Sequence, residues 1–390
     1  MDKSLYLFNP ENDMALAHGK SRFVIRRSVQ KMKDDLSFIP AWYAENGSTV
    51  LVSNMEDIKA FLSTCPFNLD VSFVSDVIPL FNRIVPWGWN PALCRTLQEQ
   101  NIVPTSFPDE EQMNTIRQLS ARTTVVSLLQ MLREKVRGPL LGSSWILRDE
   151  SEVDVFLSQY ERVVLKAPWS GSGRGIQFLS SSKIEPPQRS WIQRTISIQQ
   201  CIVGEPAYEK VVDFAMEFYS DADGTVHFAG YSLFETDDNG VYKRNWLASD
   251  AAIEQHLTAY LPSKVLNEVK STLEHLLSEV IHGVYKGYLG IDMMICREGE
   301  KYLLHPCVEM NLRMNMGVVT RILFDRYISP SSQGFFHIEY YSKPGSAIQS
   351  HQQMTEQYPL QLTSSKIQNG YLSLTPVTED TSCQIYIVVE

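Results

Sequence analysis

The sequence VVLKAPWSGSGRGIQF occupies residues 163–178 and joins a strand pattern to a loop of unusual composition. An apolar run ends at Lys166, and after a Pro-Trp step three glycines alternate with Ser170, Ser172 and Arg174. Glycines let the backbone approach an anion closely and turn successive N–H groups inward, and the lysine adds a fixed positive charge beside them. The stretch therefore indicates a cradle for a polyphosphate, although flexible hairpin tips often have the same composition.

The spacing of these glycines, G-x-G-x-G, differs from that of the common nucleotide motifs. It fits neither GxxxxGK[ST] nor GxGxxG, and a strand pattern follows the loop where those motifs have a helix. A loop of this kind is weak evidence by itself, so its partners elsewhere in the chain matter.

A late hairpin carries a second group of polar side chains. Glu309, Asn311 and Arg313 lie on one face of their strand because side chains repeat every two residues. Asp292 lies on the partner strand, and a turn near Gly299 would leave it about three residues short of Glu309. The two carboxylates therefore share a site if the hairpin contains a bulge or a slip of register.

This group suits a divalent cation. The neighbouring residues on both strands are apolar, and carboxylates in such surroundings need a partner. Two carboxylates and an amide oxygen are hard donors of the kind that Mg²⁺ prefers beside phosphates. Asp292, Glu309 and Asn311 are therefore the predicted metal ligands, and a structural salt bridge with Arg313 is the alternative interpretation.

Composition and charge predict a cytoplasmic globular protein. The 390 residues, 44% of them hydrophobic, provide a core for two or three domains of roughly 150 residues each. The net charge of -10 argues against a surface that attracts nucleic acid or a membrane. The apolar run Leu5–Phe8 is too short for a secretory signal, and no stretch approaches the roughly 20 residues of a membrane span. The six cysteines form no CxxC pair, so we expect reduced thiols.

The first part of the chain alternates short apolar runs with helical patterns, which predicts a small α/β domain with a parallel sheet. Strands are expected at 5–8, 49–53 and 71–74, and helices at 55–64 and 91–101. Because ligands bind at the carboxyl ends of parallel strands, Asn9–Asp13 are of interest. A turn followed by a helix cap is the alternative interpretation of these five residues.

The remainder of the chain is predicted to begin with helices and to continue mainly with strands. Helices are expected at 109–136, with a break near Ser120, at 149–160 and at 263–282. Besides the late hairpin, strands are expected within 175–181, 192–204, 208–220 and 225–234, with Asp223-Gly224 as a hairpin turn. Beyond residue 331 only 371–377 and 384–390 have strand patterns.

The lysine strand, the glycine loop and the late hairpin together resemble the ATP-grasp superfamily. VVLKAPWSGSGRGI is followed over a hundred residues later by GYLGID and VEMNLRMNMG, which matches that superfamily's acid on a late strand and its E-x-N-x-R sequence. The match runs from about Ser120 to Ile328. It implies an α+β clamp of two lobes at about 119–198 and 199–330, preceded by a small α/β domain at 1–118 and followed by an accessory segment at 331–390.

The resemblance also implies contacts with the nucleotide. Lys166 resembles the lysine on the α- and β-phosphates, and Arg122 stands where many members have another phosphate-contacting lysine. The residues that resemble the mobile lid are Ser170, Gly171, Ser172, Gly173, Arg174 and Gly175. The segment QQCIVGE resembles the connection between the lobes. This implies that Gln199 or Gln200 contacts the adenine edge, with the backbone of Cys201 and Ile202 beside it. Members commonly have glutamate at the first of these positions, so Gln199 is a departure. Glu205 would accept hydrogen bonds from the ribose hydroxyls.

Further roles follow from the same resemblance. Asp292, Glu309 and Asn311 resemble the ligands of Mg²⁺, which Mn²⁺ can replace. Arg313 resembles a catalytic cation that acts with Lys166 and steadies the transferred phosphate or the reacting carboxylate. Lys243 and Arg244 lie where members often place another phosphate or substrate contact. An exposed loop is the alternative interpretation of that pair.

The resemblance implies an ATP-dependent ligase with ATP and Mg²⁺ as its cofactors. A carboxylate attacks the γ-phosphate, and an amine or thiol then opens the acylphosphate, which requires no protein nucleophile. The sequence shows no Ser-His-Asp or Cys-His arrangement. A kinase acting on a small-molecule hydroxyl and a non-catalytic nucleotide-binding protein are the alternatives. The expected partners are a small carboxylate and an amine, with no nucleic acid and no membrane, and a homodimer is a further expectation because the superfamily often dimerises.

Overall fold

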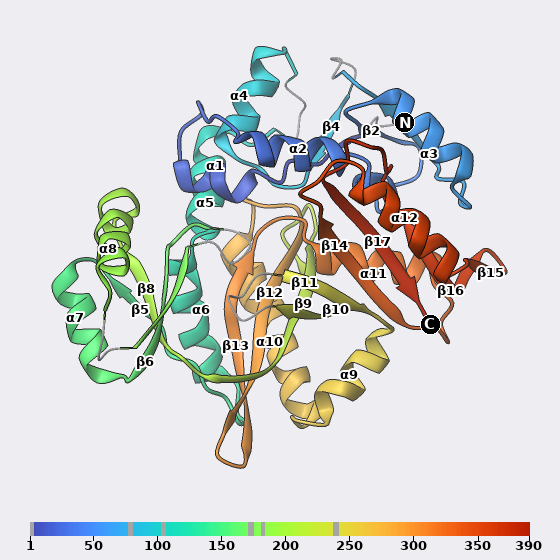
Figure 1. Cartoon of the computed structure of the whole chain (residues 1–390). Helices are drawn as coiled ribbons and strands as arrows, with labels where there is room; N and C mark the ends of the chain where they lie inside the picture. Colours follow the sequence, from blue (N-terminus) through green and yellow to red (C-terminus); the bar gives the residue numbers. More distant parts are fainter. Residues whose placement is uncertain (1–3, 77–80, 103–106, 171–174, 181–183, 237–241) are drawn as a thin grey trace.

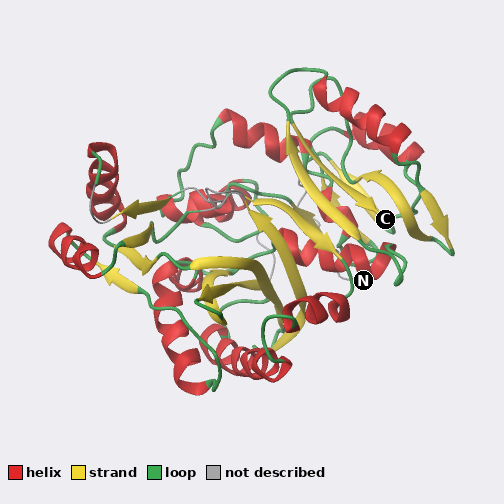
Figure 2. Cartoon of the chain, turned by 60° about the horizontal axis from the view of Figure 1, so that its bottom comes forward, coloured by secondary structure: helices red, strands yellow, loops and turns green. Residues whose placement is uncertain are grey.

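A computed structural model of the chain describes residues 4–76, 81–102, 107–170, 175–180, 184–236 and 242–390. Within these residues the strands form three sheets, and the helices pack around these sheets (Figure 1, Figure 2). The arrangement is a mixed α/β fold with a small parallel sheet followed by antiparallel sheets, which confirms the predicted fold class.

The N-terminal domain is built on the parallel sheet β3-β2-β1-β4. Its elements are β1 (Ser4–Leu7), α1 (Asn12–His18), α2 (Arg27–Asp35), the 3-10 helix η1 (Ile39–Trp42), β2 (Ser48–Leu51), α3 (Met55–Thr64), β3 (Val71–Val74), β4 (Arg83–Pro86) and α4 (Pro91–Glu99). All four residues of β1 are buried, as expected for a strand with neighbours on both sides. The predicted strands and helices of this domain are confirmed, and β4 is an addition to them.

Two helices connect this domain to a small antiparallel lobe with the strand order β5-β8-β6-β7. The elements are α5 (Glu110–Leu119), α6 (Arg122–Lys135), β5 (Trp145–Leu147), α7 (Glu150–Gln159), β6 (Arg162–Lys166), β7 (Ile176–Ser180), α8 (Pro186–Gln199) and β8 (Ile202–Pro206). The break near Ser120 is confirmed, because it caps α5 and α6 begins two residues later.

The prediction of a strand within 192–204 is wrong for most of these residues. Residues 186–199 form α8, and only the last three residues of the predicted strand belong to β8. Pro186 begins the helix, and Glu185 and Gln188 form a capping box there. Ile192 and Ile196 then lie one turn apart and pack on the core of the lobe. The high β-propensity of these residues concealed their helical spacing.

A large antiparallel sheet forms the second lobe and the centre of the molecule (Figure 1). Its elements up to residue 327 are β9 (Glu209–Ser220), β10 (Val226–Thr236), β11 (Tyr242–Leu247), α9 (Asp250–Thr258), α10 (Ser263–Ile281), β12 (Gly287–Glu298), β13 (Lys301–Asn311) and α11 (Met316–Tyr327). Phe214 and Phe218 of β9 share a buried cluster with Leu273 of α10, so this helix covers one face of the sheet. Ala215 and Glu217 alternate with them and lie on the opposite face.

The C-terminal segment contains more regular structure than its sequence indicates. It comprises β14 (Gly334–Tyr340), α12 (Ser346–Gln357), β15 (Gln361–Thr363), β16 (Lys366–Ser373) and β17 (Cys383–Val389). Within the described residues these strands extend the large sheet, whose order is β13-β12-β9-β10-β11-β14-β17-β16-β15. Trp42 of the N-terminal domain donates a 2.7 Å hydrogen bond from Nε1 to the carbonyl of Leu374. The segment therefore joins the clamp to the N-terminal domain.

Candidate active site between the lobes

The late hairpin places the predicted metal ligands together. A β-bulge between Asp292 and Met294 shifts the register, so that Asp292 on β12 lies directly opposite Glu309 on β13. The required bulge is therefore present, and the two carboxylates face the same side of the sheet. Asn311 hydrogen-bonds to Asp292 from two residues further along β13.

Arg122 connects this hairpin to the loop that follows Lys166. Its Nη2 lies 2.9 Å from both carboxylate oxygens of Glu309, and its Nη1 donates to the carbonyl of Ala167 at 2.8 Å and to Oγ of Ser170 at 2.5 Å. Arg122 begins α6 and is only 3% exposed. One buried guanidinium therefore links the start of the glycine loop to the acidic hairpin.

Lys166 ends β6 in a buried ion pair. Its Nζ lies 2.7 Å from Oε2 of Glu205, and Ser144 donates to Oε1 of the same carboxylate at 2.8 Å. Burial alone would raise the pKa of Glu205, but the charge of Lys166 and the two hydrogen bonds lower this pKa below its ordinary value. Glu205 therefore stays ionised and neutralises Lys166.

Two of the predicted nucleotide contacts have different surroundings from those expected. Glu205 is 2% exposed and its oxygens are taken by Lys166 and Ser144, so its carboxylate is not open to ribose hydroxyls as predicted. Gln199 ends α8, where its amide group bonds the backbone N–H and carbonyl of Trp169 at 2.9 and 3.3 Å. Gln199 thus anchors the start of the glycine loop.

The connection between the lobes lies later in the chain than predicted. Gln200 caps α8 in a left-handed conformation, Cys201 follows it, and Ile202 begins β8 inside the small lobe. The chain passes to the large sheet only between Pro206 and Glu209. The expected connection, QQCIVGE at 199–205, therefore lies inside the small lobe, because β8 pairs with β5 and β6.

The glycine loop itself is described only at its two ends. Ser170 contacts Arg122, and Gly175 has a φ of 80°, which favours glycine. The predicted lid residues Gly171, Ser172, Gly173 and Arg174 lie outside the described residues. Arg244 binds Glu235 at 2.8 and 2.9 Å and stacks on Phe335, and Lys243 is exposed.

Arg313 is held by a residue of the N-terminal domain. Its Nε and Nη2 each donate to one carboxylate oxygen of Asp13 at 2.8 Å, and Nη2 also donates to Oδ1 of Asn311 at 3.0 Å. Burial would lower the pKa of Arg313, but the carboxylates of Asp13 and Glu309 raise it above its ordinary value. Asp13 belongs to the segment singled out after β1, whose contact with Arg313 could not be predicted from its turn-like sequence.

The sequence interpretation missed a third carboxyl group beside the predicted ligands. Glu217 on β9 is 1% exposed, and Asn315 donates to its Oε2 at 2.7 Å. Burial is the main cause that raises the pKa of Glu217 to about 8. Burial and the charge of Glu309 likewise raise the pKa of Asp292 to about 7. The alternation of β9 could have placed Glu217 on this face, but an isolated glutamate among apolar residues gives no further signal.

A cavity of about 280 Å³ opens beside these carboxyl groups. The N-terminal domain contributes Phe8 and Trp87 to its wall, and the large sheet contributes Ser232 and Asn245. Asn245 donates to Oγ of Ser232 at 2.7 Å, while its own buried Oδ1 has no hydrogen-bond partner among the described residues. Asp292, Glu309, Asn311 and Arg313 line the same cavity.

The donor set fits a hard divalent cation. Among the residues that the structure describes, no cluster of three or more His, Cys, Asp or Glu side chains could hold a metal ion. Asp292 and Glu309, with the amide of Asn311, supply fewer protein ligands than Mg²⁺ requires. Mg²⁺ commonly takes its remaining ligands from water and substrate phosphates, which suits an open set of this kind.

Comparison with known proteins identifies the fold through structure alone. No family model matches the chain, and no curated protein matches its sequence. N5-carboxyaminoimidazole synthetase from Staphylococcus aureus, complexed with ADP, has a TM-score of 0.52 at 11% identity, covering 100% of this chain and 94% of that one. Biotin carboxylase from Campylobacter jejuni, in a complex described as β-γ-ATP, has a TM-score of 0.53 at 13% identity over 100% and 88% of the two chains.

A third solved structure extends this likeness. The biotin carboxylase domain of 2-oxoglutarate carboxylase from Hydrogenobacter thermophilus, with MgADP, ADP and bicarbonate, has a TM-score of 0.51 at 13% identity, covering 100% of this chain and 86% of that one. The chain therefore has the ATP-grasp fold over its whole length. In the described part of the chain no helix has both the length and the apolar character that crossing a membrane requires.

Proposed function

We propose that this protein is an ATP-dependent ligase that activates a carboxylate as an acylphosphate and joins it to an amine. The observation that carries the proposal is the group in which Arg122 joins the loop after Lys166 to the acidic hairpin. We place the nucleotide cleft there, beside the cavity that Asp292, Glu309 and Arg313 line. The solved neighbours with ADP or MgADP support a nucleotide in that cleft. Mg²⁺ held by Asp292, Glu309 and Asn311 would neutralise phosphate charge.

The cationic side chains have distinct tasks in this proposal. Lys166 ends its strand at the start of the glycine loop, where its ammonium group would contact the phosphates of ATP. Arg122 already reaches both the loop and Glu309, so it would orient the phosphates relative to the hairpin. Arg313 would bind the reacting carboxylate from its Nη1 side, because Nε and Nη2 already donate to Asp13.

The first bond forms between a carboxylate oxygen and the γ-phosphorus, and the bond from that phosphorus to the β-γ bridging oxygen breaks as ADP leaves. Positioning and charge neutralisation carry this step, so no side chain has to act as a nucleophile. The amine then attacks the acyl carbon, and inorganic phosphate leaves. The amine nitrogen must lose a proton in this second step.

The cavity beside the hairpin suits an amine acceptor. The Oδ1 of Asn245, for which the described residues offer no partner, can accept a hydrogen bond from an amine, and Glu217 has a carboxyl group whose pKa of about 8 lies near physiological pH. A group with such a pKa is well matched to accept a proton from the attacking amine. We therefore assign this cavity to the acceptor and the role of proton acceptor to Glu217.

An ADP-release screen tests the proposal. The protein is incubated with MgATP and pooled small carboxylates, with and without pooled amines, and products are identified by mass spectrometry. We expect ADP formation that depends on a carboxylate, and trapping of the acylphosphate by hydroxylamine. A stable phosphoester without hydroxamate would instead support the kinase, and absence of ADP with every pool would contradict both. The cytoplasmic location and the homodimer stay predictions.

A further inference from the structure

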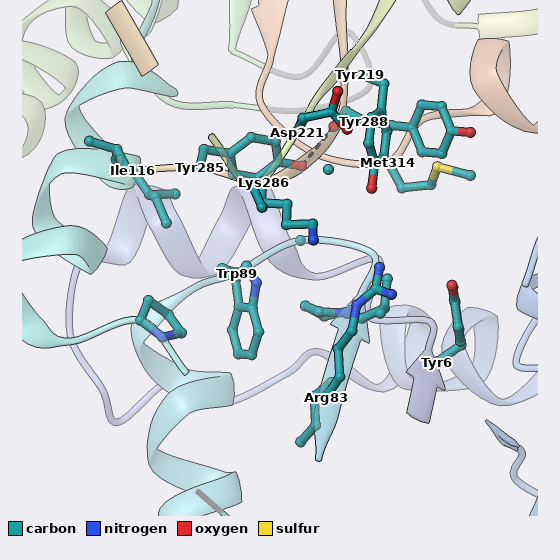
Figure 3. A pocket seen from close by; sticks show the side chains of 18 of the residues that line it. Tyr6, Arg83, Trp89, Ile116, Tyr219, Asp221, Tyr285, Lys286, Tyr288 and Met314 are labelled. Atoms are coloured by element: carbon teal, nitrogen blue, oxygen red, sulfur yellow. Dashed lines mark hydrogen bonds between the residues drawn. The ribbon is translucent and has the colours of Figure 1, made fainter. Parts of the chain in front are cut away.

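A second cavity, of about 450 Å³, lies where the N-terminal domain meets the large sheet (Figure 3). β4 forms one side of it, and the ends of β9 and β12 with the turn before β12 form the other. Its lining includes none of Lys166, Asp292, Glu309 or Arg313. The cavity is therefore distinct from the nucleotide cleft and from the acceptor cavity.

Two cations converge in this cavity from opposite sides. Figure 3 shows Lys286, from the turn before β12, and Arg83, from β4, pointing toward each other. Arg83 is 30% exposed and binds both oxygens of Glu45 through Nη1 at 2.9 and 3.0 Å. Lys286 is exposed, and no described residue forms an ion pair or hydrogen bond with its ammonium group. Lys286 therefore has its full charge available to a ligand.

The other charged groups in the lining are already engaged. Arg326 donates from Nη1 to the carbonyls of Trp42 and Ala44 at 3.4 and 3.0 Å. Asp221 lies 3.0 Å from Nε2 of His227, and Glu45 is held by Arg83. The carboxylates thus have partners, whereas Lys286 has none in the described part of the chain, and the cavity favours an anion.

Aromatic side chains form much of the remaining wall. Tyr219 and Tyr288 meet edge to face with their ring centroids 4.8 Å apart. Trp89 lies across the cavity from Arg83, and Tyr285 lies beside Lys286 (Figure 3). Tyr285 is 9% exposed and donates from its hydroxyl to the carbonyl of Tyr288 at 2.6 Å, which fixes its ring. Rigid aromatic walls of this kind favour a flat ring over an aliphatic chain.

We propose that this interdomain cavity binds a small aromatic anion. The phosphate or carboxylate of the ligand would lie between Lys286 and Arg83, and its ring would pack against Tyr288 and Trp89. This site goes beyond the ligase function proposed above, because it needs neither ATP nor turnover.

The cavity also shares a wall with the catalytic segment. Met314 lines it and follows Arg313 directly in the chain. The backbone N–H of Met314 donates to the carbonyl of Trp87 at 2.9 Å, and Trp87 lines the acceptor cavity. A ligand in the second cavity would therefore contact the segment that positions Arg313 without entering the reaction site.

Calorimetric titration of the full-length protein with phenyl phosphate tests the site. Inorganic phosphate and phenol serve as the two halves of the probe. We expect saturable binding of phenyl phosphate, at least about tenfold tighter than either half, because ring and anion contacts act together. Saturating MgADP should leave this binding unchanged.

Variants locate the binding. Lys286→Met should weaken phenyl phosphate about tenfold through loss of the free charge, and Tyr288→Leu should weaken it without changing the charge of the site. Lys264→Met, at the far end of α10, is the matched control and should bind as the wild type does. Absence of saturable binding, displacement by MgADP, or equal binding to Lys286→Met would each overturn the proposal. Each readout is independent of ADP formation, so a failure of the proposed ligase function would not affect it.

Discussion

Asp13 and Arg313 form a two-pronged ion pair across 300 positions of sequence, with both N–O distances at 2.8 Å. Asp13 lies in the first turn of α1, directly after the first strand of the parallel sheet, and Arg313 lies just beyond β13. The pair therefore ties the orientation of the candidate catalytic arginine to the position of the N-terminal domain.

Substitution Asp13→Asn should lower kcat for ADP formation by roughly tenfold to a hundredfold, because a misplaced catalytic group loses that much rate. Asparagine is nearly isosteric but cannot accept two charge-assisted hydrogen bonds from the guanidinium. Steady-state kinetics under the screened conditions measure the effect on kcat and on KM for ATP. Asp70→Asn, on the exposed surface of the same domain, is the control. An unchanged kcat would show that Arg313 does not depend on Asp13.

Glu309→Gln should abolish ADP formation and weaken the response to Mg²⁺. The substitution removes one carboxylate from the predicted ligand set and the charge that pairs with Arg122. Glu298→Gln, at the exposed end of β12, should behave as the wild type. Removal of metal with EDTA should stop the wild-type reaction, and Mg²⁺ or Mn²⁺ should restore it. Normal turnover in the Glu309 variant would refute the metal assignment.

The sequence predicted those parts of the site that depend on local periodicity. Glu309, Asn311 and Arg313 share a face because of the two-residue repeat of a strand, and Asp292 joins them because a bulge aligns it with Glu309. Lys166 was placed correctly at a strand end for the same reason. The order of these motifs along the chain was enough to indicate the fold.

Contacts between distant segments could not be predicted in this way. Glu217 and Asn315 are 98 positions apart, and their hydrogen bond depends on how α11 packs on the sheet. Most of the strand predicted within 192–204 is a helix, because Ile192 and Ile196 favour strands locally while their spacing and the capping box produce a helix. The C-terminal strands form by pairing with the edge of the large sheet, where β14 pairs with β11 and with β17. The sequence of the C-terminal segment alone gives no sign of this pairing.

The stability of the protein should fall as the pH rises toward 8. The pKa of Glu217 is raised to about 8 in the folded state, so the folded protein binds a proton there that the unfolded chain releases near its ordinary value of 4.5. Between these two values the folded state holds more protons, and its free energy of unfolding decreases with rising pH by up to about 1.4 kcal/mol per pH unit for this group. Below the lower value this contribution is fully present.

Urea unfolding from pH 5 to pH 8 measures this dependence. Glu217→Gln should have a flatter profile than the wild type, because the amide does not ionise and can still accept the hydrogen bond from Asn315. Glu356→Gln, on the exposed surface of α12, should keep the wild-type slope. Parallel profiles for Glu217→Gln and the wild type would show that Glu217 is ionised in the folded protein.

The last prediction concerns Lys166 and Glu205, whose buried ion pair is 2.7 Å long with side chains 6% and 3% exposed. Glu205→Gln should destabilise the protein by about 3 to 5 kcal/mol, because it leaves a buried ammonium group without its counter-charge. The double variant Lys166→Met/Glu205→Gln should recover much of this loss, since no buried charge remains. Because the pKa of Glu205 is lowered in the folded state, its contribution is present above the ordinary carboxyl pKa and is lost as the pH falls through the lowered value. Urea unfolding at pH 7 and at pH 3 measures both effects. If Glu205→Gln and the double variant were equally unstable at pH 7, the loss of unfolding free energy would come from altered packing around Glu205. The unpaired charge of Lys166 would then not be its cause.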